Sequence, residues 1–134
     1  PNNDHLYVSI AFKLEKDGKT GKKKISLIEN GEVAIFFPAE KETSNLKFHI
    51  HAPFASTVAR DSIKDREENT ELIKLISELL CEATAWAKKN DLLDFDFIKC
   101  LPIDDDNLSE FYKPIQDKIV DLFKRKDYFS RRTN

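Results

Sequence analysis

The sequence predicts an α+β domain in which about four strands form a mixed or antiparallel sheet, with helices on one face of the sheet and further helices towards the C-terminus. Two observations carry this prediction. Residues 1–53 contain segments that alternate apolar and polar side chains, which is the period of a strand. Residues 69–126 repeat apolar side chains at intervals of three and four, which is the period of a helix. Strands first and helices afterwards are typical of an α+β fold.

The strands are expected in four segments. Residues 6–14 alternate most clearly, and residues 25–28 follow a turn, so these two segments predict a hairpin. Residues 33–37 are apolar on both faces, which favours a central strand that ends at Pro38. Residues 46–51 alternate again and predict the fourth strand.

The helices are expected in the second half of the chain. The apolar stripe that contains Leu72, Ile76 and Trp86 predicts a long helix that begins at residue 69 or 70 and ends near residue 90. Residues 92–101 predict a short helix. Pro114 fits the first turn of a helix, so we expect a turn over residues 108–112 and a helix over residues 114–126.

The chain is expected to form one domain, because 134 residues with 40% hydrophobic content can build one sizeable core. Within it, residues 1–53 are mainly strands, 54–68 form a loop, 69–126 are mainly helices and 127–134 are a tail. The first residue is a proline in place of an initiator methionine, so we expect a fragment of a larger protein.

Composition argues against several partners. The 22 basic side chains nearly cancel the 24 acidic ones, so no overall field favours nucleic acid or an anionic membrane. No apolar run reaches the roughly 18 residues that a membrane span needs, and residues 1–5 do not resemble a signal peptide. Cys81 and Cys100 lie in apolar stretches without metal-ligand spacing, which favours reduced core thiols and a cytoplasmic location.

Two groups of residues resemble metal ligands only in part. His49 and His51 lie on one face of a predicted strand, but a third ligand is not evident, so we favour packed or hydrogen-bonded histidines. The carboxylates of Asp104, Asp105 and Asp106 lack the spacing of a calcium loop. A solvated loop that ends in a helix cap is the better interpretation.

Basic clusters and catalytic motifs give little support for an independent enzyme. Residues 22–24 and 131–132 are basic and would suit phosphate contacts, but aromatic residues are not interleaved with them, so we favour solvated charge. The sequence has only three glycines and lacks a glycine-rich phosphate loop and a nucleophile motif. An autonomous enzyme is therefore not expected.

The connection between the last predicted strand and the long helix contains the best candidate side chains. The guanidinium group of Arg60 suits phosphate oxygens, and Ser56 and Thr57 add neutral donors. The competing interpretation is a surface ion pair of Arg60 with Asp61 or Glu67.

Residues 42–61 resemble a segment of sacsin repeats and of bacterial ATP-binding proteins that are built on the heat-shock-ninety type of ATPase. The family order is Phe-Leu-Pro, Glu-Thr-Gly-Leu, a strand with His, and then Phe-Ala with a short loop that ends in Arg. Phe36-Phe37-Pro38 begins the same order here, and the resemblance covers about residues 32–101. Ser44-Asn45 stands in place of the family Gly, and Asp61 stands in place of a second Arg.

The resemblance implies the domain that follows the ATP-binding domain, called the middle or transducer domain in the gyrase, chaperone, kinase and MutL group. Its fold is similar to the second domain of small-subunit ribosomal protein five. In the chaperones a Ser-Arg-Glu loop reaches the γ-phosphate of ATP, and Ala59-Arg60-Asp61 resembles that tripeptide. The resemblance makes Arg60 the phosphate sensor, Asp61 its orienting partner and residues 56–59 the support. We add Lys64 from its position alone.

The resemblance also implies ATP and Mg²⁺ in the full-length protein, bound by the preceding domain of the same chain and not by these residues. Two other functions stay open. One is a module that binds protein or nucleic acid through the sheet face or residues 22–24. The other is a dimerisation segment that pairs the apolar stripe of residues 114–126 between two chains.

Overall fold

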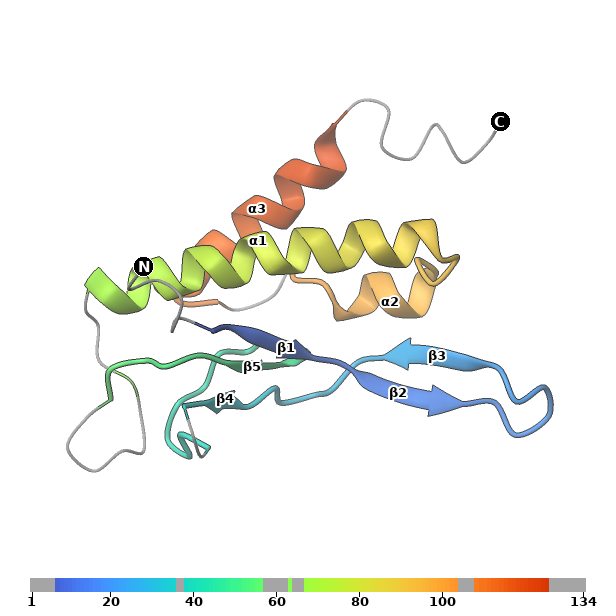
Figure 1. Ribbon diagram of the computed structural model, residues 1–134, viewed down its shortest axis with the longest axis horizontal. Coiled ribbons are helices and arrows are strands. Elements are labelled where there is room, and N and C mark those ends of the chain that lie inside the picture. Colours follow the sequence, from blue (N-terminus) through green and yellow to red (C-terminus); the bar gives the residue numbers. More distant parts are fainter. Residues whose placement is uncertain (1–6, 36–37, 57–62, 64–66, 104–107, 126–134) are drawn as a thin grey trace.

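The computed structural model describes residues 7–35, 38–56, 63, 67–103 and 108–125. Within these residues the fold is α+β, and the helices lie on one face of the strands (Figure 1). The strands are β1 (Ser9–Ala11), β2 (Lys13–Lys16), β3 (Lys23–Ser26), β4 (Val33–Ala34) and β5 (His49–His51). The helices are α1 (Glu67–Lys89), α2 (Phe95–Cys100) and α3 (Lys113–Lys124).

The described strands form two small sheets. In the three-stranded sheet the order is β1-β5-β4, where β5 is antiparallel to β1 and parallel to β4. Strands β2 and β3 form a separate antiparallel pair. The prediction of an α+β fold with a mixed or antiparallel sheet and helices on one face is confirmed. In place of one sheet of about four strands, the described residues form a three-stranded mixed sheet and a separate pair of strands.

Two predicted strands differ from the structure. The segment over residues 6–14 contains two strands, because β1 pairs with β5 and β2 pairs with β3. The segment over residues 33–37 was expected in the centre, but β5 occupies the centre and β4 lies at the edge. Pro38 forms a β-bridge with Ala34, and the backbone N–H of Ala39 donates to the backbone oxygen of Val33 at 2.8 Å. Phe36 and Phe37 of the predicted strand lie outside the described residues.

The three predicted helices are confirmed with shifted ends. Glu67 and Glu68 lie in the first turn of α1 and Lys88 and Lys89 in its last, where their charges complement the helix dipole. Helix α2 begins later than predicted because Asp94 is its N-cap and accepts from the backbone of Phe97.

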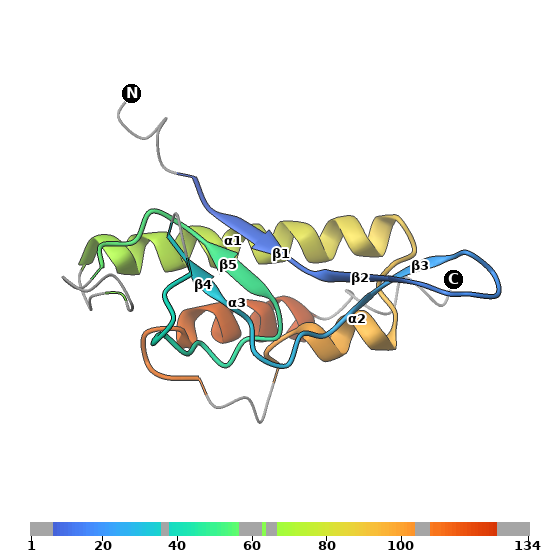
Figure 2. The same cartoon turned by 90° about the horizontal axis from the view of Figure 1, so that it is seen from below.

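The core lies between the layer of strands and the layer of helices (Figure 1). Seen from below, the strands lie in front of α1 (Figure 2). The ring of Phe12 lies 5.3 Å from that of Phe48 and 5.4 Å from that of Phe97, measured between centroids. In α1 the buried stripe runs through residues such as Ile73 and Leu80, whereas Trp86 is exposed. The prediction that Trp86 belongs to the buried stripe was therefore wrong, because the stripe continues to Ala87 instead.

Helix α3 packs along α1, and its apolar side chains are used within the chain. Ile115 and Ile119 are fully buried in the core, and Leu122 and Phe123 pack against it. The buried part of this stripe is not available for pairing between two chains. None of the helices described is long and apolar enough to cross a membrane.

Candidate functional site

Two residues of the connection between β5 and α1 pair with each other. Ser56, which is half-buried, and Ile63 form an isolated antiparallel β-bridge. The predicted site residues Thr57, Arg60, Asp61 and Lys64 lie outside the described residues, so their roles stay predictions. The structure describes Ser56 and Ile63, the residues on either side of the stretch 57–62, and the contacts that hold them.

The start of the connection is fixed by Asn69 in the first turn of α1. Its side-chain Oδ1 accepts from the backbone N–H of Ala55 at 2.8 Å, and its Nδ2 donates to the backbone oxygen of Ala55 at 3.0 Å. The Asn69 side chain is fully buried. One amide group therefore satisfies both backbone polar groups of Ala55, which would otherwise be costly to leave without partners.

The end of the connection is fixed by Glu42, from the segment between β4 and β5. Its Oε1 accepts from the backbone N–H of Ile63 at 3.1 Å, and its Oε2 accepts from the hydroxyl of Tyr112 at 2.5 Å. Tyr112 is the N-cap residue of α3 and is almost fully buried. Burial, together with the bond to Glu42, raises the pKa of Tyr112 well above its ordinary value.

We call Glu42, Ala55, Ile63, Asn69 and Tyr112 the loop anchor. Sequence reasoning did not select its polar members as site residues, because the bonds join residues that are 14, 21 and 70 positions apart. A local signal exists only for Asn69. It is in helical phase with the buried Ile73 and Ile76, and an amide on an apolar stripe indicates a specific hydrogen-bond partner.

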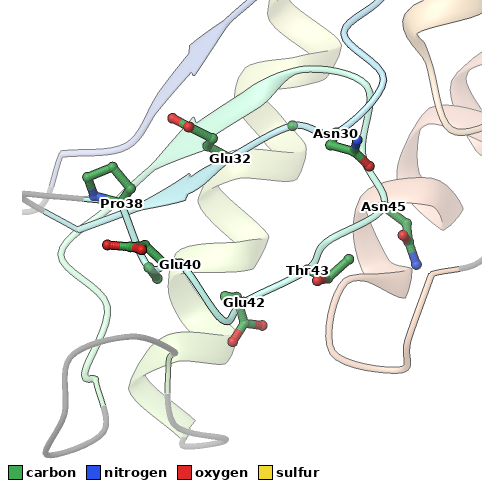
Figure 3. Close-up of a pocket in the computed structure, with 9 residues that line it drawn as sticks. Asn30, Glu32, Pro38, Glu40, Glu42, Thr43 and Asn45 are labelled. Carbon is green, nitrogen blue, oxygen red and sulfur yellow. The ribbon is translucent and has the colours of Figure 1, made fainter.

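A pocket of about 370 Å³ lies beside the loop anchor (Figure 3). It is lined by residues on either side of the β4 region: Asn30, Gly31, Glu32, Pro38, Ala39, Glu40, Glu42, Thr43 and Asn45. Three of these side chains are carboxylates and none is basic. Such a lining repels phosphate groups, so the pocket does not suit a nucleotide.

The histidine prediction is confirmed for His49. Its Nδ1 accepts from the backbone N–H of Glu32 at 2.8 Å, while Phe48 and Ile50 are buried on the opposite face of β5. His51 is half-buried on the same strand. Among the residues that the structure describes, no group of three or more His, Cys, Asp and Glu side chains has an arrangement suited to a metal ion.

The two cysteines are free thiols, as predicted. Cys100 is buried, and burial with nearby Asp96 and Asp94 raises its pKa to about 11. Cys81 is half-buried, and burial raises its pKa as well. Because the thiolate is the nucleophile, both thiols are poorly suited to nucleophilic catalysis near neutral pH.

The basic residues 22–24 are exposed on the β2–β3 hairpin. The Nζ of Lys24 lies 3.4 Å from a carboxylate oxygen of Asp96 in α2, so part of this charge is balanced. The predicted acidic loop at residues 104–106 and the basic pair at 131–132 lie outside the described residues.

Comparisons with protein-family models, with curated proteins and with solved structures find no match. The resemblance to sacsin-like ATP-binding proteins therefore depends on the sequence of residues 32–101 alone.

Proposed function

We propose that this chain is a transducer or middle-like domain of a heat-shock-ninety or sacsin-type ATP-binding protein. In this proposal Arg60 contacts the γ-phosphate of ATP held by the preceding domain and couples the nucleotide state to conformation. The supporting observation is the loop anchor, which joins both ends of the Arg60 connection to the body of the fold. The proposed likeness to the second domain of small-subunit ribosomal protein five belongs to the same proposal.

A connection whose two ends are held by hydrogen bonds suits a residue that must contact an anion bound by another domain. The entropy lost when a side chain is placed on a ligand is smaller when the chain on either side is already held. The guanidinium group of Arg60 would donate to phosphate oxygens, with Asp61 orienting it, Ser56 and Thr57 supporting the loop and Lys64 as a weaker second cation.

ATP and Mg²⁺ are assigned to the preceding domain. The acidic pocket beside the loop anchor does not suit phosphate, which agrees with a proposal in which another domain binds the nucleotide. This chain would then be an accessory part of an ATPase in the cytoplasm and not an enzyme on its own. Its positive charge would act on the negative charge that the γ-phosphate oxygens carry in the transition state.

The test is Arg60→Ala in the full-length protein. We expect turnover to fall by roughly 10²-fold or more, with a smaller change in ATP affinity, because the contact strengthens in the transition state. Arg125→Ala is the matched control, since Arg125 is an exposed arginine just after α3. Equal turnover in wild type and Arg60→Ala would contradict the proposal.

One observation favours a second candidate, a module that binds nucleic acid or an acidic protein. The β2–β3 hairpin extends past the helices and carries exposed lysines at Lys13, Lys16, Lys22 and Lys23 (Figure 1). Binding to nucleic acid that weakens steeply with added salt would support this candidate. Binding that is absent at low salt would exclude nucleic acid as the partner.

A further inference from the structure

Helix α1 carries more apolar side chains than the core covers. Its buried stripe, which includes Leu72, Ile76 and Leu80, belongs to the core. A second row of apolar side chains runs along one flank of the helix: Leu75, Leu79, Ala83 and Trp86. We call these four residues the outer row. They recur at intervals of three and four positions, so they lie in one line on the helix surface.

The outer row reaches solvent and lies away from α3. Leu75 is 36% exposed and Trp86 is 56% exposed, while Leu79 between them is half-buried. Helix α3 lies beside α1, where the Sγ of Cys81 donates to the backbone oxygen of Lys118 (Figure 2). At about 100° per residue, the side chains of Cys81 and Trp86 point in directions roughly 140° apart. Helix α3 therefore packs on a different side of α1 from the outer row.

Negative charge lies next to the outer row. Glu78 and Glu82 are exposed on α1, and each lies three positions from a leucine of the row, which makes the two side chains neighbours on the helix surface. Lys74 lines a pocket shared with α3 instead, and Lys89 belongs to the last turn of α1, beyond Trp86. The middle of this face therefore combines apolar area with negative charge.

We propose that the outer row docks a helix of a partner protein, and that this helix carries one apolar stripe flanked by Lys or Arg. The backbone groups of α1 bond within the helix, so α1 offers only side chains, and helices pack through interlocking rows of side chains. Leu75 and Trp86 lie roughly 16 Å apart along the axis, at about 1.5 Å per residue, which a partner helix of about three turns covers. Its basic side chains would meet Glu78 and Glu82. The proposal does not depend on the function of Arg60.

The charge of this face disfavours three other occupants. A second copy of the chain would bring the same glutamates to a two-fold interface, where like charges repel. An anionic membrane surface would be repelled as well, because interfacial helices that bind such membranes have basic polar faces. Nucleic acid is repelled for the same reason. A basic, amphipathic helix is the partner whose charge complements both glutamates.

The test uses two synthetic helical peptides of about 15 residues each. One has a stripe of Leu flanked by Lys, and the other has Glu at every Lys position. Trp86 is the only tryptophan of the chain, so its fluorescence reports on the outer row. We expect the Lys peptide to shift the Trp86 emission to shorter wavelength and to bind with a Kd below about 100 μM. The Glu peptide should do neither.

An aromatic residue elsewhere on the surface provides a matched control for Trp86. Phe95 in α2 is 72% exposed and does not belong to the outer row. Measured by anisotropy of a labelled Lys peptide, Trp86→Ala should weaken binding by about tenfold or more, because tryptophan is enriched among the residues that dominate interfaces. Phe95→Ala should leave the affinity unchanged. Both side chains are exposed, and circular dichroism checks that both variants keep their helices.

A second pair of variants tests the charge. Glu82→Gln should weaken binding of the Lys peptide and make it less sensitive to salt, because one attractive charge is lost. Glu110→Gln is the control, since Glu110 is an exposed glutamate outside α1. It should match wild type in affinity and in salt dependence.

Four results would overturn the proposal. Equal binding of the Lys and Glu peptides would show that charge does not select the partner. Equal losses in Trp86→Ala and Phe95→Ala would show that binding does not use the outer row. A shift of the Trp86 emission on raising the protein concentration without peptide, with a dimer in sedimentation, would show that a second copy covers the row. Absence of saturable binding of the Lys peptide would show that the row does not dock a basic helix.

Discussion

The loop anchor and the β2–β3 hairpin both contain hydrogen bonds and charged side chains, but the surroundings of these groups differ. In the anchor, Asn69 and Tyr112 are buried. In the hairpin all four residues of β2 are exposed, and the Lys13–Glu15 pair, at 3.3 Å, has side chains that are 53% and 44% exposed. Exposed ion pairs contribute at most about 1 kcal/mol, whereas a buried group without a partner costs about 1–3 kcal/mol. Burial, and not the number of bonds, decides which region contributes more to the free energy of unfolding.

The largest effect is expected from adding a methyl group at Gly31, beside the three-stranded sheet. An added Cβ would lie 2.0 Å from the backbone oxygen of Phe48 and 2.8 Å from that of Leu46. Gly31→Ala should lower the free energy of unfolding by about 3 kcal/mol or more, because the backbone must move apart. Gly18→Ala in the hairpin should change it by less than about 0.5 kcal/mol, since nothing lies within 4 Å of its added Cβ. Urea unfolding measures both, and equal effects would contradict the close approach of Gly31 to the backbone of Phe48 and Leu46.

The next effect is expected at Asn69. Asn69→Ala removes both bonds to Ala55 and should lower the free energy of unfolding by about 2 kcal/mol. Asn90→Ala is the control, because the Asn90 side chain also donates to a backbone oxygen, that of Trp86 at 2.8 Å, but in an exposed position. It should cost less than about 0.5 kcal/mol. If Asn69→Ala lowers the free energy of unfolding no more than Asn90→Ala does, then burial does not make the Asn69 bonds more important than the Asn90 bond.

The smallest effect concerns alkaline pH. The pKa of Tyr112 is raised in the folded protein above the ordinary value of 10.0, because burial and Glu42 disfavour the phenolate. The folded state therefore holds this proton longer than the unfolded chain does. The resulting stability is complete below pH 10 and is lost as the pH rises above it, by up to about 1.4 kcal/mol per pH unit.

Unfolding by urea at several pH values checks this sign. Tyr112→Phe should show a shallower loss of stability above pH 10 than wild type does. In folded wild type, absorbance should show that Tyr112 keeps its proton at pH 10, because its hydroxyl is buried and bonded to Glu42. Ionisation of Tyr112 near pH 10 without unfolding would contradict the burial of its hydroxyl.

The helices were predictable because their signals are local. The apolar period of α1 and Pro114 at the start of α3 both lie within a few positions of the structure that they predict. The alternation over residues 6–14 also correctly predicted β-strand structure, but an alternating pattern does not show which other strand the segment pairs with. The change from β5 to β3 at Phe12 therefore could not be predicted from that segment.

The loop anchor was less predictable for the same reason. The segment that contains Glu42 drew attention through its family resemblance, and Tyr112 was expected only in a turn. Neither residue carries a local pattern that specifies the other, because their bond joins the segment after β4 to the start of α3. The chemistry of Arg60 was proposed from residue type and resemblance, and that residue lies outside the described part of the chain.

The position of β5 between β1 and β4 has a consequence for the order in which the sheet can assemble. Strands β2 and β3 are joined by a short turn, so they can pair as soon as residue 26 has left the ribosome. Ser9 can pair only after His51, its partner in the register of β1 and β5, has been synthesised. Closing that longer loop costs more chain entropy. Strands β1 and β4 therefore both remain unpaired until β5 has been made. Because β1 is synthesised first, it stays without its partner for the longer time.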